Sequence, residues 1–326
     1  MEWIPPMEPI STGTLLTGPE WVHQIKWDGI RGMTYYQSGS DSEGLHIFTK
    51  SGRDRTQFYP ELHGIRDGIR AKNAVLDGEM VVLGQNGKPS FHFSLIREQV
   101  RNSNRLAHYT RAYPVAYVLF DILFRNDRLL TGLPWKERAE ILRDTISFPG
   151  GSNIAITDDF SDGQALFQLM KEKNWEGIIS KRRKSLYFPS KKHHDWYKHK
   201  ALKRILGAVC GIQWKGDSPN SLVLGIHPQN QWICVGKVSL GLTQKDLKNL
   251  KRFSQVQKKE SCPFPDAVRS FVEGSSGPIV WLNPQITCWV RFLEWTDKGY
   301  LRHPRILGFT DLRAEDANGR EWSMDE

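Results

Sequence analysis

A lysine at position 26 stands where a strand is expected to end and a glycine turn to begin. Residues 26–31 read Lys-Trp-Asp-Gly-Ile-Arg and follow a short apolar run that starts at Trp21. The two-residue period of a strand places Gln24 and Lys26 on one face. A lysine that shares a face with a glutamine beside a turn is well placed to meet a ligand. A surface hairpin with solvated charges is the alternative interpretation.

Two carboxylates are expected on separate strand-like segments. Glu79 shares a face with Asp77 in the run 75–83, and Glu176 begins a second run at 174–182. Carboxylates from two strands can hold a hard divalent cation or the hydroxyl groups of a ribose. Solvated carboxylates at strand ends are the alternative for each residue.

Two lysines and one aromatic residue lie in strand-like segments further along. Lys198 and Lys200 share a face with Trp196 by alternation. Two lysines two positions apart can point at one phosphate chain and neutralise its charge in phosphoryl transfer. A solvated basic strand is the alternative. Phe120 lies in an otherwise apolar run at 113–124, so packing in the core is its default interpretation.

The segment 181–204 is strongly basic. It carries ten Lys or Arg residues and one acid, Asp195, so its net charge of 10 − 1 = +9 equals that of the whole chain. Aromatic residues are interleaved with these bases, which is typical of a surface that follows a phosphate backbone. A solvated basic loop is the alternative. The bases predicted to contact nucleic acid are Lys181, Arg182, Arg183, Lys191 and Lys192.

The composition is that of an ordinary folded protein with a basic excess. The 326 residues include 45 Lys+Arg and 36 Asp+Glu, and 39% of the chain is hydrophobic. This length favours about two domains, and the balance excludes a mainly disordered chain. We expect no membrane span, because no apolar run reaches about 18 residues. We expect no secretory signal, because the first ten residues carry neither a basic region nor an apolar one. The four cysteines form no Cys-x-x-Cys pair, so reduced thiols in a cytosolic protein are expected.

Strand-like runs and helical signals alternate as far as residue 204. The strand-like runs lie at 21–27, 32–37, 45–50, 75–83, 113–124 and 174–182. Pro134 is expected to open a helix over 135–146, since proline favours the first helical position. Ser161 and Gln164 are spaced as a capping box for a second helix. Three apolar residues share one face of that helix: Leu166, Leu169 and Met170.

The character of the sequence changes near residue 205. Strand-like runs follow at 205–215, 221–227, 231–238, 277–283 and 285–296. One helix, opened by Thr243 and Asp246, interrupts them. About five strands and one helix predict a small barrel, with an OB-fold as the leading candidate. The predicted domains are therefore 1–204 and 205–313, and residues 314–326 are read as a solvated acidic tail.

The motif at 26–31 resembles the nucleotidyl-lysine motif of the covalent nucleotidyltransferases, which include DNA ligases, RNA ligases and mRNA capping enzymes. Segments similar to the later motifs follow in the family's order, at 51–53, 76–79, 120–123, 176–181, 196–200 and 302–305. Three of them, Leu-Asp-Gly-Glu, Phe-Asp-Ile-Leu and Trp-x-Lys-x-Lys, are most similar to those of ATP-dependent DNA ligases. The short architecture resembles that of bacterial repair and end-joining ligases, and the resemblance covers about residues 1–313.

This resemblance implies an α+β fold and a set of site residues. A nucleotidyltransferase (adenylation) domain of mixed, mainly antiparallel sheets with helices would precede an all-β OB-fold barrel with one helix. Lys26 would be the catalytic nucleophile, and Phe120 would stack on adenine. Mg²⁺, or Mn²⁺ in its place, would be held by Glu79 and Glu176. The nucleotide would contact Gln24, Ile25, Arg31, Arg53, Glu79, Phe120, Glu176, Lys198, Lys200, Arg302 and Arg305.

A lysine that attacks a phosphorus atom must be in its neutral amine form. With a reference pKa of about 10.4, roughly one lysine in 2,500 is neutral at pH 7. Nearby cations lower a lysine pKa because they disfavour ammonium, so Arg31, Arg53 and a bound metal ion are expected to act on Lys26. Asp28 would oppose them, and the turn at Gly29 is expected to aim it elsewhere. The product would be a covalent lysyl-AMP.

The implied function is ATP-dependent sealing of nicked double-stranded DNA, in repair, by a monomer that is cytoplasmic and nucleoid-associated. A DNA-end-binding or repair protein is an expected partner, and no membrane is. Departures from the family pattern include Gln24, where these ligases usually carry Glu, and the stretch 310–313. Ser190 and Lys192 also stand where Gly and Arg are usual. Alternatives are an RNA ligase, a capping-type guanylyltransferase, or an inactive nucleic-acid-binding module.

Overall fold

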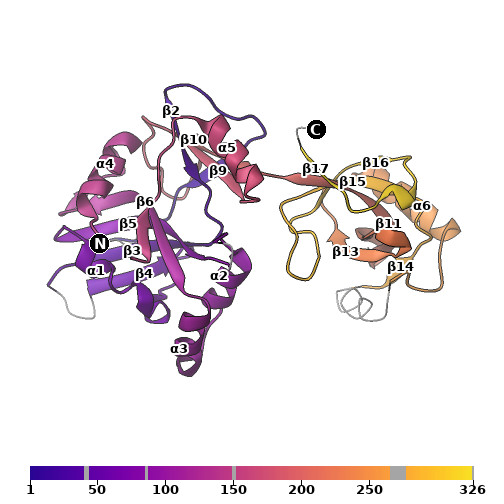
Figure 1. Ribbon diagram of the computed structural model, residues 1–326, viewed down its shortest axis with the longest axis horizontal. Helices are drawn as coiled ribbons and strands as arrows, with labels where there is room; N and C mark the ends of the chain where they lie inside the picture. Colours follow the sequence, from indigo (N-terminus) through magenta and orange to yellow (C-terminus); the bar gives the residue numbers. More distant parts are fainter. Residues whose placement is uncertain (40–43, 85–86, 149–151, 265–276, 325–326) are drawn as a thin grey trace. The chain divides into compact units, whose positions relative to one another are not determined.

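The computed structural model describes residues 1–326 except 40–43, 85–86, 149–151, 265–276 and 325–326. The chain forms two compact units, Met1–Ala201 and Leu202–Glu326, and each is described by itself (Figure 1). No helix within the described ranges is both long and apolar enough to span a bilayer.

The first unit is built on two β-sheets. The larger has the strand order β4-β3-β5-β6-β7 with β8 added to β6, and the smaller has the order β1-β10-β9-β2. Among the described strands only β6 with β8 and β1 with β10 pair in parallel, which confirms the mixed, mainly antiparallel prediction. The larger sheet comprises β3 (Ile30–Gln37), β4 (Leu45–Thr49), β5 (Asn73–Val82), β6 (Val115–Arg125), β7 (Arg128–Leu129) and β8 (Ile154–Ile156). The smaller comprises β1 (Glu8–Ser11), β2 (Trp21–Ile25), β9 (Gly177–Arg182) and β10 (Lys192–Lys200).

The helices described in this unit are α1 (Ile65–Gly68), α2 (Phe91–Glu98), α3 (Ser103–Ala112), α4 (Trp135–Thr145) and α5 (Gly163–Glu172). Of these, α2 and α4 pack on the larger sheet and α5 packs on the smaller one, whereas α3 lies at one end of the unit (Figure 1). The predicted helix at 135–146 is α4, with Pro134 as its N-cap. The capping box predicted for α5 is wrong. Asp162, not Ser161, is the N-cap, and its carboxylate accepts from the N–H groups of Gln164 and Ala165. Leu166 and Met170 are buried as expected, whereas Leu169 is exposed.

In its described residues, the second unit is the predicted small barrel with one α-helix. Its sheet has the order β13-β12-β11-β15-β16, and β14 and β17 also pair with β11. The long β11 contacts four partners and shifts register twice against β12, which lets one strand bend around the barrel. The helix α6 (Gln244–Val256) begins with the predicted capping box of Thr243 and Asp246. The strands are β11 (Lys203–Lys215), β12 (Ser218–Ile226), β13 (Ile233–Val238), β14 (Ile279–Trp281), β15 (Thr287–Phe292), β16 (Arg305–Thr310) and β17 (Glu321–Ser323).

The segment 314–326 is not the solvated tail that its acidic composition suggested. β17 pairs with the first residues of β11, and Trp322 packs edge-on against Trp289. Ala314 and Ala317 are buried. These small side chains and one tryptophan anchor residues 314–324, while Glu315 is exposed and Glu321 pairs with Lys203 at 2.6 Å. The end of the described chain is therefore part of the second unit.

Candidate active site

Lys26 follows directly after β2, at the mouth of the turn that leads into β3. The turn depends on Gly29, because a Cβ at this position would lie 2.2 Å from the carbonyl oxygen of Met80 in β5. The backbone N–H of Lys26 donates to the carbonyl of Gly177, which fixes the lysine against the start of β9. Its ammonium group pairs with the carboxylate of Glu176, and 20% of its side chain is exposed. The group is anchored and partly exposed, but as an ammonium it has no lone pair, so it must lose a proton before it can act as a nucleophile.

Glu176 holds two ammonium groups at once. One carboxylate oxygen pairs with Lys26 and the other with Lys200, whose Nζ lies at 2.8 Å. Burial alone would raise the pKa of Glu176, but the two lysines outweigh it and hold the pKa below its ordinary value. Glu176 precedes β9 rather than lying within a strand, because Gly177 has a φ of 137° that favours glycine.

A cavity of about 170 Å³ opens beside Lys26 between the two sheets of the first unit. The structure brings seven of the predicted residues to its wall: Gln24, Ile25, Lys26, Arg31, Glu79, Phe120 and Lys198. It adds seven residues that the sequence analysis did not assign to the nucleotide: Glu8, Pro9, Trp27, Lys50, Ile179, Lys181 and Trp196. Charged groups, three aromatic rings and one neutral amide therefore face one open pocket, as in a nucleotide site.

Arg31 lines this cavity, but its charge is already engaged. Its Nε and Nη2 donate to the two carboxylate oxygens of Asp77 at 2.5 and 2.6 Å, and Tyr187 donates to the same carboxylate at 2.7 Å. Burial would lower the pKa of Arg31, and the Asp77 carboxylate raises it more strongly. This neutralised pair can orient a ligand, but it is a weaker cation toward Lys26 than the sequence suggested.

Glu79 is the carboxylate best suited to a divalent cation. Burial raises the pKa of Glu79 to about 7, while Arg31 and Lys26 act in the opposite direction. Within the described part of the chain, no hydrogen bond to its carboxylate is found, so its oxygens keep their capacity for a ligand. A hard cation such as Mg²⁺ fits this oxygen donor. Glu176 fits less well, because both of its oxygens already pair with lysines.

Phe120 presents its ring to the cavity between two cations. The guanidinium of Arg31 and the ammonium of Lys181 each lie 4.7 Å from its ring centroid. Lys181 also lies 4.2 Å from the Trp196 ring and donates to the carbonyl of Phe120 at 3.2 Å. Burial lowers the pKa of Lys181 to about 8. The assignment of Lys181 to a DNA-binding surface was wrong, because the residue is only 2% exposed and faces the cavity.

Gln24 reaches the cavity from β2, and its amide is held from behind. Its Nε2 donates to Asp159 at 2.7 Å, and the other carboxylate oxygen of Asp159 pairs with Arg143 from α4. Burial and the ammonium groups of Lys26 and Lys200 lower the pKa of Lys198, which also lines the cavity. The cavity wall therefore offers one neutral hydrogen-bonding amide, Gln24, and several cations suited to a polyphosphate.

Two family models match this chain, one in each unit. The family model described as "ATP dependent DNA ligase domain" matches residues 8–200. The chain belongs to the ATP-dependent DNA ligase family. A second model, described as "ATP dependent DNA ligase C terminal region", matches residues 215–314. These matches confirm the predicted nucleotidyltransferase domain, the OB-fold barrel and the ligase resemblance.

The relatives of this chain include bacterial and archaeal ligases. The multifunctional non-homologous end joining DNA repair protein LigD of Mycobacterium tuberculosis is 30% identical over 90% of this chain and 36% of that protein. DNA ligase 2 of Methanosarcina acetivorans is 27% identical, over 88% and 51% of the two chains. This chain spans about a third of the length of the LigD proteins.

Two solved structures of LigD ligase domains have the same fold as this chain. The crystal structure of the ligase domain of M. tuberculosis LigD has a TM-score of 0.52 and 27% identity, and the match covers 96% of this chain and 97% of that domain. Mycobacterial DNA ligase D complexed with ATP and MES matches with the same TM-score and coverage at 26% identity.

Five predicted nucleotide contacts of this ligase chain are not among the residues of the cavity wall: Arg53, Glu176, Lys200, Arg302 and Arg305. Glu176 and Lys200 pair with each other next to Lys26. Arg53 is 57% exposed on its side chain and approaches Glu98 at 3.9 Å, and Lys50 lines the cavity instead. Arg302 and Arg305 belong to the second unit. Arg302 donates to Glu294 at 2.6 Å, and Arg305 opens β16 as an exposed residue. Their roles toward the nucleotide remain predictions.

The remaining predicted DNA contacts of the ligase lie on the surface of the first unit. Lys191 and Lys192 are exposed before and at the start of β10. Arg182 stacks over the Trp21 ring at 4.5 Å, and Arg183 donates to the carbonyl of Pro19 at 3.0 Å. The two lysines are thus the most available of the set for a phosphate backbone.

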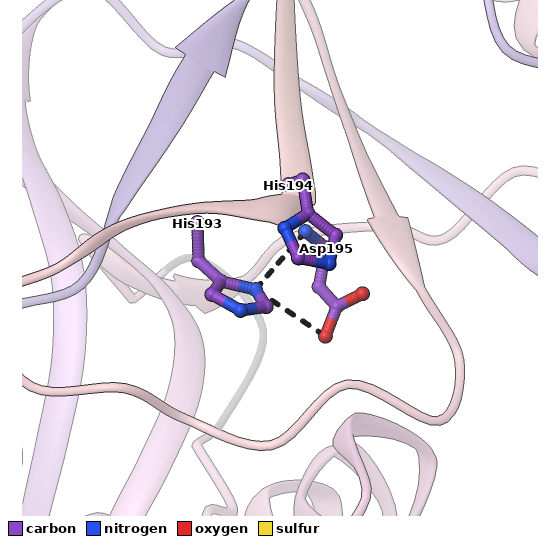
Figure 2. A group of neighbouring side chains, drawn as sticks. All are labelled: His193, His194 and Asp195. Atoms are coloured by element: carbon purple, nitrogen blue, oxygen red, sulfur yellow. Dashed lines mark hydrogen bonds and ion pairs between the residues drawn. The ribbon is translucent and has the colours of Figure 1, made fainter.

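Two histidines and an aspartate gather at the start of β10. One nitrogen or oxygen atom of each lies within 4.8 Å of the others (Figure 2). Nδ1 of His193 accepts from the N–H of Asp195 at 3.3 Å and lies 3.4 Å from its carboxylate. The other carboxylate oxygen pairs with Arg182 at 3.2 Å. Because Arg182 already neutralises Asp195, and Lys192 is adjacent to His193 in the chain, the cluster belongs to the basic surface and is a poor cation site.

Proposed function

We propose that this chain seals 5′-phosphate/3′-hydroxyl nicks in double-stranded DNA with ATP, in three steps. The Lys26 amine attacks the α-phosphate of ATP, forms the lysyl-AMP bond and releases pyrophosphate. The AMP then moves to the 5′-phosphate at the nick, and the Lys26 amine is regenerated. The 3′-hydroxyl finally attacks the activated 5′-phosphate, which forms the phosphodiester bond and releases AMP. A covalent intermediate divides one difficult transfer into easier ones.

One observation carries this proposal. The anchored amine of Lys26 faces a cavity whose wall also carries Glu79, Phe120 and Lys198. Lys198 and Lys200 would neutralise charge that develops on the transferring phosphate, which is the main requirement of phosphoryl transfer. Glu79 would hold Mg²⁺, which lowers the charge of the bound phosphates when it is present. Phe120 offers a face on which adenine would stack.

A role in DNA repair is part of the proposal. Its support is the similarity to the LigD proteins, whose names include non-homologous end joining and DNA repair. The partner would then be a broken or nicked duplex, together with a DNA-end-binding or repair protein. We propose a monomer that works at the nucleoid in the cytoplasm, with Lys191, Lys192, Arg182 and Arg183 following the DNA backbone.

The test is the covalent adduct. We expect α-labelled ATP with Mg²⁺ to label the wild type, and a chase with a nicked duplex to move the label to DNA and seal it. Lys26→Arg keeps the positive charge without a usable amine, so it should acquire no label. Labelling from GTP but not ATP would favour a guanylyltransferase, transfer only to RNA ends an RNA ligase, and no adduct with either nucleotide a binding module.

A further inference from the structure

Gln24 is the one neutral amide among the residues described at the cavity wall. The edge of a purine base presents neutral hydrogen-bond donors and acceptors, whereas phosphates call for cations. Gln24 and Lys26 lie two positions apart on one face. A nucleotide with its α-phosphate at Lys26 can therefore turn its base edge toward Gln24. The orientation of the Gln24 amide then decides which base fits.

A glutamine amide is ambiguous, because a half-turn exchanges its acceptor for its donor. Asp159 removes this ambiguity. Nε2 of Gln24 lies 2.7 Å from Oδ1 of Asp159, and a carboxylate accepts hydrogen bonds but cannot donate them. The nitrogen must therefore face Asp159. Among the described residues no donor to the Gln24 carbonyl is found, so its acceptor is available at the cavity wall.

Asp159 is itself held from the other side. Its second carboxylate oxygen pairs with the guanidinium of Arg143, which lies in the last turn of α4. Asp159 lies in the segment between β8 and α5, so three separate segments meet at this carboxylate. Its two oxygens are thus divided between an anchor at Arg143 and the amide of Gln24.

We propose that Asp159, anchored by Arg143, sets the base selectivity of this ligase by locking the Gln24 amide with its carbonyl toward the nucleotide. The proposal rests on the proposed function. A fixed acceptor accepts from the 6-amino group of adenine and opposes the 6-oxo group of hypoxanthine or guanine. A glutamate at position 24 would present an acceptor in either rotamer, whereas a glutamine needs the lock. Asp159 is therefore a positioning residue rather than a catalytic one.

The experiment measures kcat/KM of adduct formation at Lys26 with three triphosphates. These are ATP, inosine triphosphate, and the purine riboside triphosphate that lacks a 6-substituent. We expect the wild type to prefer ATP over inosine triphosphate by about 10- to 100-fold, with the purine riboside between them. Asp159→Asn frees the amide to rotate and should reduce that preference to about 3-fold or less. Asp158→Asn makes the same charge change at the exposed neighbouring position and should leave the preference unchanged.

A variant at position 24 tests whether Asp159→Asn acts through the Gln24 amide or by disturbing the fold. In Gln24→Glu protein the new carboxylate would lie against that of Asp159, and adding Asp159→Asn replaces the second carboxylate by an amide donor. The double variant should therefore keep the preference for ATP that Asp159→Asn alone loses. Arg143→Gln leaves Asp159 in place and removes its anchor. Its preference for ATP is measured as a second test in case Asp159→Asn folds poorly. Because exposed ion pairs are weak, Arg143→Gln should reduce the preference by up to about 5-fold.

The outcomes distinguish this inference from the proposed function. Wild-type protein that forms no adduct with any of the three triphosphates would overturn both. If the wild type forms the ATP adduct, an unchanged preference in Asp159→Asn and Arg143→Gln overturns the lock alone. If Asp159→Asn reduces the preference equally in the wild-type and Gln24→Glu backgrounds, the lock is also overturned, because the effect would not pass through the glutamine amide.

Discussion

Glu79 lies where burial and two cations oppose one another. Burial dominates and raises its pKa to about 7, so near neutral pH the protonated and ionised forms are both populated before a cation binds. Only the ionised form is a good ligand for Mg²⁺, so metal affinity at this position depends on pH. A cation that binds there favours ionisation in turn.

This coupling predicts a pH-dependent metal requirement. At limiting Mg²⁺, the rate of adduct formation in the wild type should rise between pH 6 and pH 8 as Glu79 ionises. Glu79→Gln should remove that rise and increase the half-saturating Mg²⁺ concentration by about 10-fold or more. The measurement is labelled-adduct formation across a pH and Mg²⁺ series. An identical pH profile in Glu79→Gln would show that another group titrates.

The same shift has a consequence for stability without nucleotide and metal. The folded pKa of Glu79 lies above its ordinary value of 4.5, so between pH 4.5 and about 7 the folded state keeps a proton that the unfolded chain has lost. Stability therefore falls as pH rises through this window, by about 2 kcal/mol between pH 5 and pH 8 relative to Glu79→Gln. Urea unfolding of both proteins at the two pH values measures it.

Motif residues were predictable one by one, whereas their partners were not. Lys26, Glu79 and Phe120 were identified from local sequence, and the structure places them at one cavity. Asp159 reaches Gln24 over a separation of 135 residues, which no local pattern reveals. Lys181 was assigned to the wrong surface, because the composition of a basic run does not show which of its side chains point into the cavity. Its position two residues after Ile179 on β9, which also lines the cavity, was the usable signal.

At the scale of elements, buried strands were easier to predict than exposed ones. β5 and β6 are long apolar runs that are buried almost throughout, so hydrophobicity alone locates them. β1 and the start of β10 carry polar and charged residues and exist because they pair with each other in parallel. Such pairing is a long-range property. The helices α2 and α3 were missed because few of their residues are buried.

α4 is attached to β6 by a fully buried ion pair. Arg138 donates from Nε and Nη2 to the two carboxylate oxygens of Asp121 at 2.7 and 2.9 Å, and neither side chain is exposed. Its Nη1 donates to the carbonyls of Leu133 and Ser185. The pair thus joins the helix, the sheet and the segment after β9, and it fixes β6, which carries Phe120.

Breaking this pair on one side should be costly. Arg138→Met leaves the Asp121 carboxylate buried and uncompensated, so we expect a loss of about 3–5 kcal/mol in the free energy of unfolding. Arg138→Met with Asp121→Leu removes both charges and should recover most of that loss. Arg111→Met, at an exposed position of α3, should change stability by less than about 0.5 kcal/mol. Urea unfolding compares the variants, and additive losses in the double variant would contradict the interpretation.

For the whole molecule, the basic excess should show in the salt dependence of DNA binding. Each phosphate contact that is lost reduces the slope of log affinity against log salt by about 0.9. Replacing Lys191 and Lys192 by alanine should therefore flatten the slope by about 2 and weaken binding to all sequences alike. Lys245→Ala with Lys248→Ala, exposed on α6 in the second unit, is the matched control. Equal slopes for the two double variants would remove Lys191 and Lys192 from the DNA contacts.

The two units raise a question about the order of the steps. Arg302 and Arg305 lie in the second unit, whereas Lys26 and its cavity lie in the first. Pyrophosphate is present only in the first step, so an arginine that serves the leaving group is needed for adduct formation but not for the final sealing. A hinge is expected near 201–206, and because β11 begins at Lys203, Ala201 and Leu202 would be the residues that act as this hinge.

Arg305→Ala should therefore separate the steps. We expect adduct formation from ATP to slow by about 10-fold or more, because one charge on the leaving group loses its partner. Sealing of a duplex that already carries the 5′-adenylate should stay within about 2-fold of wild type, since no pyrophosphate is involved. Arg313→Ala, an exposed arginine of the same unit paired with Asp316, controls for charge. If Arg305→Ala slows both reactions equally, Arg305 contributes to DNA binding or to the stability of the barrel. The proposed role of Arg305 toward pyrophosphate, and the hinge that depends on it, would then be wrong.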